Sequence, residues 1–165
     1  MIAYPHLFEP WARDGQMPRY SAVFLVDRSD HENIEAIEAA IQAAIEKGMQ
    51  RYAGFDPATC RRPLREGSES LMRFMENCLA INARSRRQPG VVDDMVRYIT
   101  DPEGIWSGCI VNASLDFYPW YRNGECGVAA GLGNVQLVSQ EERQDIIIRA
   151  DHEFRPLHDF EDLPF

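Results

Sequence analysis

The chain has 165 residues, of which 45% are hydrophobic and 26% charged, and its formal net charge is −9. This length and composition are typical of one soluble globular domain. No apolar run approaches the ~20 residues of a transmembrane helix, and the N-terminus carries no signal-peptide pattern. We therefore expect a cytoplasmic protein that does not associate with a membrane. The acidic net charge, taken alone, argues against nucleic-acid binding.

The charge is unevenly distributed along the chain. Residues 61–87 contain seven Arg and three Glu, whereas residues 151–165 contain five acidic residues and one Arg. The first segment therefore carries +4 and the second −4. A basic middle and an acidic end suggest self-complementary charge. Composition alone leaves open that both are merely solvated surfaces.

The first predicted elements are a strand and a long helix. Residues 19–30, "RYSAVFLVDRSD", are rich in β-branched and aromatic residues and predict a strand. Residues 29–48 follow as an amphipathic helix, with Ser29 and Glu32 as a capping box and Gly48 at the C-terminus. Its apolar face repeats at helical spacing through Ile34, Ile37, Ile41 and Ile45. Its acidic opposite face makes it a poor surface for DNA.

The remaining elements are mostly strands and loops. We expect a long loop over residues 49–70, followed by a strand through Leu79, Ile81 and Ala83. Residues 91–99 are compatible with a short helix. A long strand over 104–121 and a return strand over 128–139 flank the turn signal Asn123-Gly124. Residues 143–154 suggest one more strand or short helix, and disorder is expected from Pro156 onward.

About five strands and one convincing helix favour a small closed barrel of mixed Greek-key type over a doubly wound parallel sheet. The predicted fold class is therefore mostly β, a β-barrel with one long α-helix after an early strand and a disordered acidic C-terminal tail. We divide the chain into a barrel domain over residues 1–150 and a flexible tail over residues 151–165.

The common catalytic and metal-binding motifs are missing from the sequence. There is no glycine-rich phosphate loop, no H-E-x-x-H motif and no G-x-S-x-G elbow. The four Cys form no C-x-x-C pair and the four His show no metal-ligand spacing, so we expect reduced thiols, no metal and no cofactor. These absences favour a non-enzymatic protein.

Aromatic and basic residues occur together in "DFYPWYRNG". Strand alternation places Tyr118 and Trp120 on one side and Phe117 and Tyr121 on the other, beside Arg122 at a hairpin tip. Such surfaces bind single-stranded nucleic acid, because a ring can stack on any base and arginine can contact phosphates. The alternative is that the aromatic residues cap one end of the barrel. Further candidate contacts to the DNA backbone come from Arg61, Arg62, Arg65, Arg84, Arg86 and Arg87.

Six segments occur in an order that resembles the phage and prophage OB-fold single-stranded DNA-binding proteins, a family long known only as a domain of unknown function. The segments are "AYPHLFEP", "RYSAVFLVDRSD", "RPLREGSE", "INARSRRQPGVVD", "WSGCIVNASLDFY" and "GVAAGLGNVQLV". The resemblance covers most of residues 3–138. It implies an OB-fold, single-stranded DNA binding in phage replication or recombination, a homodimer, and a groove near Arg84, Ser85, Arg86, Pro89 and Tyr118.

The C-terminal "DFEDLPF" is similar to the acidic tip of bacterial single-stranded DNA-binding proteins, in which the tip docks replication and repair enzymes. A terminal carboxylate can pair with a cation while the last Phe fills a pocket. By this similarity, the partner-binding residues are Asp159, Phe160, Glu161, Asp162, Leu163, Pro164 and Phe165.

The resulting hypothesis is a sequence-independent single-stranded DNA-binding protein acting in the cytoplasm of a phage-infected or prophage-bearing bacterium. Two alternatives remain open from the sequence. One is a recombination protein that anneals complementary strands. The other is a protein–protein interaction module whose barrel groove holds a peptide, with no nucleic-acid role.

Overall fold

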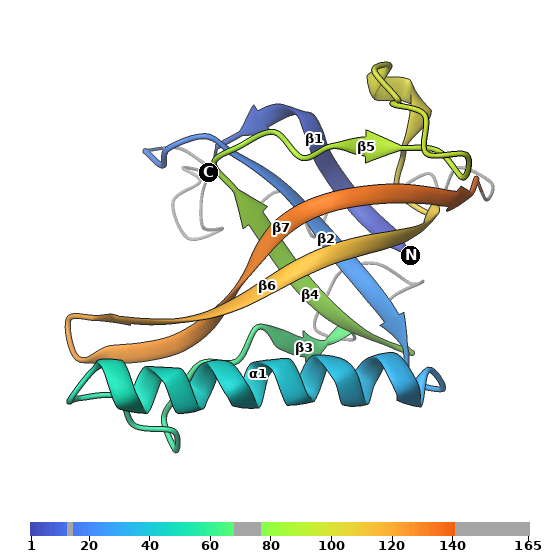
Figure 1. Cartoon of the computed structure of the whole chain (residues 1–165). Coiled ribbons are helices and arrows are strands. Elements are labelled where there is room, and N and C mark those ends of the chain that lie inside the picture. The colour runs from blue at the N-terminus through green and yellow to red at the C-terminus, as the bar shows by residue number, and fades with distance from the viewer. Residues whose placement is uncertain (13–14, 68–76, 141–165) are drawn as a thin grey trace, which may run out of the picture.

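The computed structural model describes residues 1–12, 15–67 and 77–140 of the chain. In these ranges a strongly curved sheet lies beside one long helix (Figure 1). In chain order, the elements are β1 (Ile2–Trp11), β2 (Arg19–Asp27), α1 (His31–Arg51), β3 (Leu64–Glu66), β4 (Cys78–Ser85), β5 (Val91–Val92), the 3₁₀ helix η3 (Pro102–Gly104), β6 (Ile110–Arg122) and β7 (Glu125–Ser139).

The strands form a nearly closed barrel. The sheet has the order β1-β2-β4-β7-β5, with β3 paired to β4 and β6 paired to β7. Two backbone hydrogen bonds of 2.9 Å join Ile2 of β1 to Gly108 and Cys109, just before β6. Because β6 is the outer partner of β7, these bonds bring the two ends of the sheet together. The expected β-barrel with one long helix after an early strand is confirmed.

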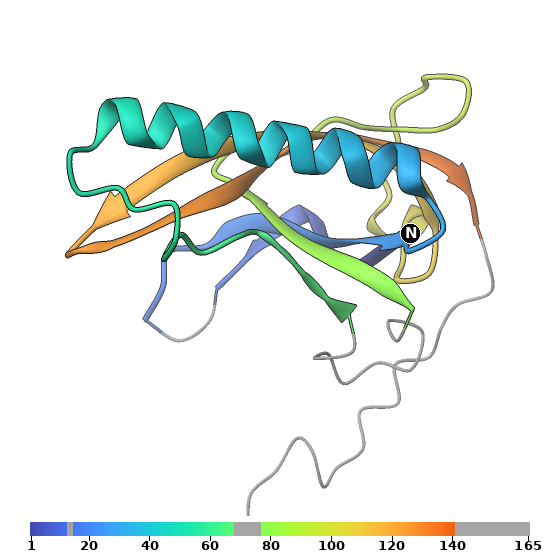
Figure 2. The same cartoon turned by 90° about the horizontal axis from the view of Figure 1, so that it is seen from below.

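The core lies inside the barrel and under the helix. Ile2, Ile81 and Val135 are almost completely buried in the main cluster. A second cluster joins α1 to β7 through residues such as Ile41 and Val128. Figure 2 shows α1 lying across the β6–β7 side of the molecule. The predicted apolar face of the helix therefore anchors it to this hairpin.

Both predicted ends of the helix were wrong. Asp30, not Ser29, caps the N-terminus by accepting a hydrogen bond from the Asn33 amide, while the Ser29 hydroxyl donates to Asp27. The helix also continues through Gly48 to Arg51. A Cβ at position 48 would lie 2.6 Å from the Phe55 ring. Glycine therefore serves close packing here and does not end the helix.

The β6–β7 connection follows the prediction, because Asn123 and Gly124 both have positive φ, of 52° and 79°, as a two-residue hairpin turn requires.

Three strands were not foreseen. β1 spans Ile2–Trp11, β3 lies within the predicted loop, and β5 replaces the start of the helix predicted over residues 91–99. Both short strands are held by neighbours, since β3 pairs with β4 and β5 pairs with β7.

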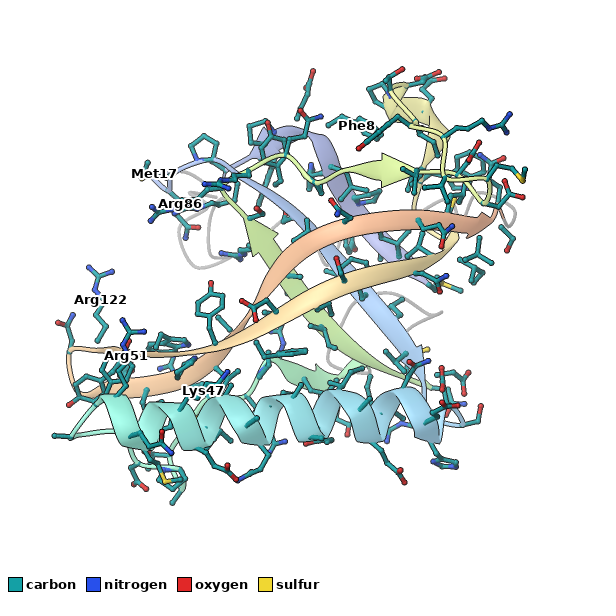
Figure 3. The ribbon with its side chains drawn as sticks, viewed as in Figure 1. Phe8, Met17, Lys47, Arg51, Arg86 and Arg122 are labelled. Atoms are coloured by element: carbon teal, nitrogen blue, oxygen red, sulfur yellow. The ribbon has the colours of Figure 1, made fainter. Side chains whose placement is uncertain are left out.

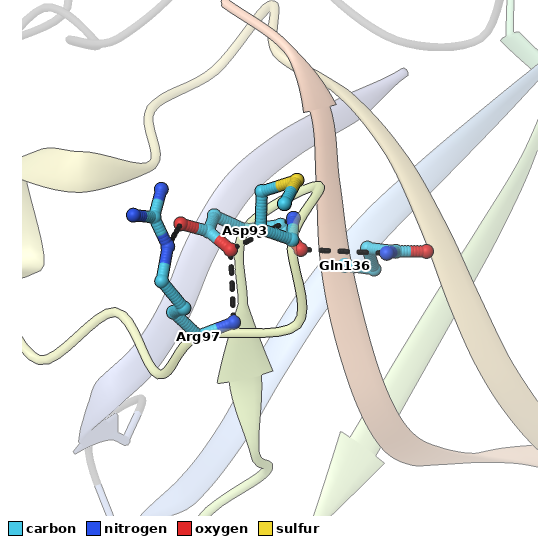
Figure 4. Close-up of polar contacts among 4 residues, drawn as sticks. Asp93, Arg97 and Gln136 are labelled. Carbon is cyan, nitrogen blue, oxygen red and sulfur yellow. Dashed lines mark hydrogen bonds and ion pairs between the residues drawn. The ribbon is translucent and has the colours of Figure 1, made fainter.

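After β5, the chain makes a tight turn around Asp93 (Figure 4). The Asp93 carboxylate accepts hydrogen bonds from the amides of Met95 and Arg97, and the Gln136 amide group donates to the Asp93 carbonyl. This turn holds Val96 at φ 62°, a conformation that β-branched residues rarely adopt. The helix predicted over residues 91–99 was therefore wrong, because side-chain hydrogen bonds define a turn there.

The predicted element at residues 143–154 and the predicted tail lie outside the described residues. Among the helices that the structure describes, none is long and apolar enough to cross a membrane.

Candidate nucleic-acid interface

The β6–β7 hairpin separates its aromatic residues onto two faces. Tyr118, Trp120 and Arg122 alternate on the outer face, with Tyr118 opposite Ala129 and Trp120 opposite Gly127. Phe117, one residue earlier, packs instead against both core clusters. This division agrees with the alternation predicted from the sequence.

Small residues of β7 leave the outer rings lying close to the backbone. A Cβ at Gly127 would lie 2.7 Å from the Trp120 ring, and one at Gly131 would lie 3.5 Å from the Tyr118 ring. Tyr118 remains 45% exposed, whereas Trp120 is half-buried. The two glycines thus let the aromatic rings lie close to the β7 backbone, and the Tyr118 ring remains partly accessible to a ligand.

A basic residue of β4 and two that follow this strand continue the surface across the sheet. Gly131 pairs with Arg84 on one side and with Asp116 on the other, so these three residues form one row across β4, β7 and β6. Arg84 is exposed, and the exposed Arg86 and Arg87 follow in the turn after β4. In Figure 3, Arg122 extends from the hairpin tip toward the side on which Arg86 lies.

A groove of about 490 Å³ runs between the C-terminal part of α1 and β6. Its helix wall carries two cations, Lys47 and Arg51, on the side that faces the hairpin (Figure 3). The remaining lining residues are Gln50, Asp116, Phe117, Tyr118 and Pro119. We expected the exposed side of α1 to be acidic, and this basic end was not foreseen. Its signal is the four-residue spacing of Lys47 and Arg51, which places both on one side of a helix.

Three of the predicted arginines lie on other segments, and two of them are paired with acidic residues. Arg61 pairs with Glu125 near the start of β7, with 2.6 Å between Nη2 and Oε1. Arg62 pairs with Glu38 of α1. Arg65 is exposed on β3. Arg84 and Arg122 therefore lie on the outer aromatic face, and Arg86 and Arg87 follow Arg84 in the turn after β4. Arg61 lies beside Gly127 of that face, and its charge is already paired.

Two of the predicted aromatic residues point toward α1. Phe117 is half-buried between the core clusters. Tyr121 stacks on Tyr52, which directly follows the helix. These two rings hold the hairpin against the helix, whereas the outer face carries the accessible ring of Tyr118. The predicted tail residues 159–165 lie outside the described residues.

The described residues contain four free cysteines and no cluster of His, Cys, Asp or Glu that could hold a metal ion. Cys60 lies beside Cys126, and burial raises the pKa of the Cys60 thiol. A protonated thiol is a poor nucleophile and a poor metal ligand. The side chains of the outer face, such as Tyr118 and Arg84, can supply stacking, hydrogen bonds and charge.

Comparison with known proteins relates the chain to a family. Residues 1–163 match the family described as Enterobacter phage Enc34, ssDNA-binding protein. Protein p50 of Acyrthosiphon pisum secondary endosymbiont phage 1 is 35% identical over 143 residues, which cover 82% of this chain and 77% of that protein.

Two solved structures share the fold. The single-stranded DNA-binding protein from bacteriophage Enc34, in complex with ssDNA, has a TM-score of 0.72 at 21% identity and covers 87% of this chain and 84% of that one. The single-stranded DNA-binding protein gp2.5 encoded by bacteriophage T7 has a TM-score of 0.53 at 16% identity, covering 88% and 96%. With the match along almost the whole sequence, these findings show that the chain belongs to the family of the Enterobacter phage Enc34 ssDNA-binding protein.

Proposed function

We propose that this protein binds single-stranded DNA with little sequence preference, as a non-enzymatic component of phage replication or recombination. The observation that carries the proposal is the outer face of the β6–β7 hairpin, where the exposed ring of Tyr118 shares one face of the sheet with Arg84 and Arg122. The family to which the chain belongs supports the same ligand.

The proposed contacts divide into two kinds. Bases stack on Tyr118 and Trp120, and each stacked base contributes roughly 1–3 kcal/mol. The phosphates are contacted by four arginines, which releases counterions and makes binding depend on salt. These are Arg84, Arg86, Arg87 and Arg122. Because neither kind of contact recognises one particular base, strands of different sequence bind with similar affinity.

The central experiment is a titration against single-stranded DNA, double-stranded DNA and single-stranded RNA at several salt concentrations. We expect the logarithm of the affinity for oligo-dT to fall linearly with the logarithm of the salt concentration, by about 0.7 for each phosphate neutralised. Tyr118→Ala should weaken binding by roughly 1–3 kcal/mol. An affinity that does not change with salt, or that Tyr118→Ala leaves unaltered, contradicts the proposed face.

Arg86→Ala combined with Arg87→Ala tests the proposed phosphate contacts. This variant should bind more weakly and show a shallower salt slope. Arg62→Ala is a suitable comparison because Arg62 is already paired with Glu38 of α1. Equal losses in both proteins would show that overall charge, and not the face itself, determines affinity.

We further propose that residues 151–165 act as a flexible acidic tail that follows a DNA-binding domain over residues 1–150. A short flexible tether keeps such a segment at an effective concentration on the order of millimolar near the basic surface. The tail and the phosphate backbone then compete for the same arginines. Bound DNA frees the tip, from Asp159 to Phe165, for a replication or recombination protein of the phage or its host.

Deletion of residues 156–165 should raise affinity for single-stranded DNA, most clearly at low salt. The matched control has the same ten residues in scrambled order, which preserves the charge and moves Phe165 from the end. This control should keep the affinity of the full chain but lose the partner captured by the intact tip. A truncated protein that binds DNA no more tightly and still captures that partner contradicts the proposal.

A homodimer and a cytoplasmic location also belong to this proposal. A homodimer is expected from the family resemblance and can be tested by measuring the mass of the protein in solution.

An annealing assay with complementary oligonucleotides separates simple binding from strand pairing, because an annealing protein accelerates duplex formation. We place this activity in the cytoplasm of a phage-infected or prophage-bearing bacterium.

A further inference from the structure

Asp116 is an acidic residue on an otherwise basic and aromatic surface. It is two residues from Tyr118 on β6, so both side chains lie on the outer face. A Cβ at Gly131 would lie 3.5 Å from Cε1 of Tyr118 and 3.7 Å from Cβ of Asp116. Gly131 thus leaves a space bordered by the aromatic ring and by the acidic residue.

The Asp116 side chain is available to a ligand. The residue is exposed and lines the groove with Tyr118 and the two cations of α1, Lys47 and Arg51. Among the described residues, no hydrogen bond or ion pair engages its carboxylate, although other acids of the chain, such as Glu38 and Glu125, are paired with arginines. A carboxylate facing phosphates would weaken binding, so its position beside the ring calls for another ligand group.

We infer that Asp116 contacts the edge of the base that stacks on Tyr118 and gives this one position a preference for bases with hydrogen-bond donors. The inference rests on the proposed binding of single-stranded DNA. Lys47 and Arg51, on the opposite wall of the groove, face the sugar–phosphate side of the same nucleotide. The acid and the cations thus recognise different parts of one nucleotide.

The preference follows from the chemistry of the carboxylate. At neutral pH it only accepts hydrogen bonds. Guanine offers the N1 and N2 donors side by side and can bind both oxygens. Cytosine and adenine each offer an exocyclic amino group, whereas thymine offers a single N3 donor between two carbonyl oxygens that repel the acid. In unpaired strands these edges are accessible to protein side chains. The expected order at this position is guanine first and thymine last.

The experiment compares four short oligonucleotides, a thymidine tract and the same tract with one central dG, dC or dA. The full-length protein should bind the dG oligonucleotide about fivefold more tightly than the thymidine tract, which is the lower end expected for a bidentate base contact. Replacing the central guanine by inosine, which lacks the 2-amino group, should reduce this ratio. A few-fold preference at one nucleotide still allows strands of any sequence to bind.

Asp116→Asn tests the residue itself. Asparagine has a similar shape but presents one acceptor and one donor group, so the ratio between the dG and thymidine oligonucleotides should fall to about one. Asp94→Asn is the matched control, because it removes the same charge at an exposed position in the turn after β5. Both variants bind somewhat more tightly in general because a negative charge is removed, and only Asp116→Asn should change the ratio.

The outcomes separate this inference from the proposed function. Equal affinity of the parent protein for all four oligonucleotides, or an unchanged ratio in Asp116→Asn, overturns the role of Asp116 and leaves single-stranded DNA binding intact. Failure of the parent protein to bind any of the oligonucleotides overturns both.

Discussion

Tyr52 and Tyr121 stack with their ring centroids 6.0 Å apart and 23° between their planes. The contact joins the residue that follows α1 to the end of β6, near the hairpin tip. The Arg51 guanidinium carbon lies 5.4 Å from the centre of the Tyr52 ring, over its face. The outer face that we propose for DNA is therefore held in place by contacts on the opposite face of the same strand.

Tyr121→Ala should lower the free energy of unfolding by about 1–2 kcal/mol, because it removes an aromatic pair and part of the contact between hairpin and helix. Urea denaturation followed by circular dichroism measures this decrease. Tyr118→Ala is the comparison, since its ring is 45% exposed and its removal should change stability by less than about 0.5 kcal/mol. Equal destabilisation by the two substitutions contradicts the separation of roles.

Gly48→Ala should destabilise the protein although alanine favours helices by about 1 kcal/mol relative to glycine. The added Cβ would lie 2.6 Å from the ring of Phe55, which is only 7% exposed and cannot move away freely. Overpacking of this kind costs about 1–3 kcal/mol and outweighs the gain in helix propensity. Thermal denaturation should therefore show a lower midpoint, and a higher midpoint would mean that Phe55 moves aside.

Lys47→Ala combined with Arg51→Ala should weaken binding of oligo-dT roughly tenfold, because one charge-assisted hydrogen bond contributes about 1.5 kcal/mol at the low end of the measured range. The salt slope should become shallower by about 0.7 for each phosphate that the variant no longer neutralises. Fluorescence anisotropy at several salt concentrations measures both quantities. Arg28→Ala removes a cation that pairs with Glu66 on β3 and should leave the slope unchanged. A shallower slope in the control as well would show that the groove has no special role.

The turn around Asp93 should open in acid. The hydrogen bond from the Arg97 amide is the main cause that lowers the pKa of the Asp93 carboxyl below its ordinary value of about 3.9. The folded turn therefore favours the carboxylate. Its contribution to stability is present above the ordinary pKa and is lost as the pH falls through the lower, folded value.

Amide chemical shifts of Met95 and Arg97, followed from neutral pH to below pH ~4, should show this opening. Asp93→Asn carries no titrating group at this position, so the acid transition of these two amides should disappear. A transition of the same midpoint in this variant would assign the opening to another acid.

The local sequence was sufficient for the elements that are stabilised by their own pattern. β2 was predicted from a β-branched and aromatic run, β4 from the apolar residues Leu79, Ile81 and Ala83, and α1 from four isoleucines at helical spacing. The β6–β7 turn followed from Asn123-Gly124, because positive φ at two consecutive positions favours this pair. The division of Tyr118 and Phe117 onto opposite faces also followed, since side chains alternate along any strand.

Tertiary contacts decided the rest. β5 spans Val91–Val92 and is too short to carry a pattern, so its existence depends on pairing with β7. In the sequence, Gly48 predicts the end of a helix. In the structure, the helix continues past it, and its missing side chain leaves room for the Phe55 ring. The closure of the barrel depends on hydrogen bonds between Ile2 and the chain before β6, which are more than a hundred residues apart in sequence.

In the candidate site too, the sequence predicts some residues, whereas only the packing of the elements brings the others together. Strand alternation and the cluster of arginines predicted Tyr118, Trp120 and Arg84 as candidate binding residues, and their contacts to DNA stay a prediction. Lys47 and Arg51 could not be assigned to this surface from the sequence, because their helix is acidic over most of its exposed length. Only the packing of α1 along β6 brings these two cations to Tyr118 and Asp116. A local pattern determines which way a side chain points, but the distance between two elements depends on the packing of the whole core.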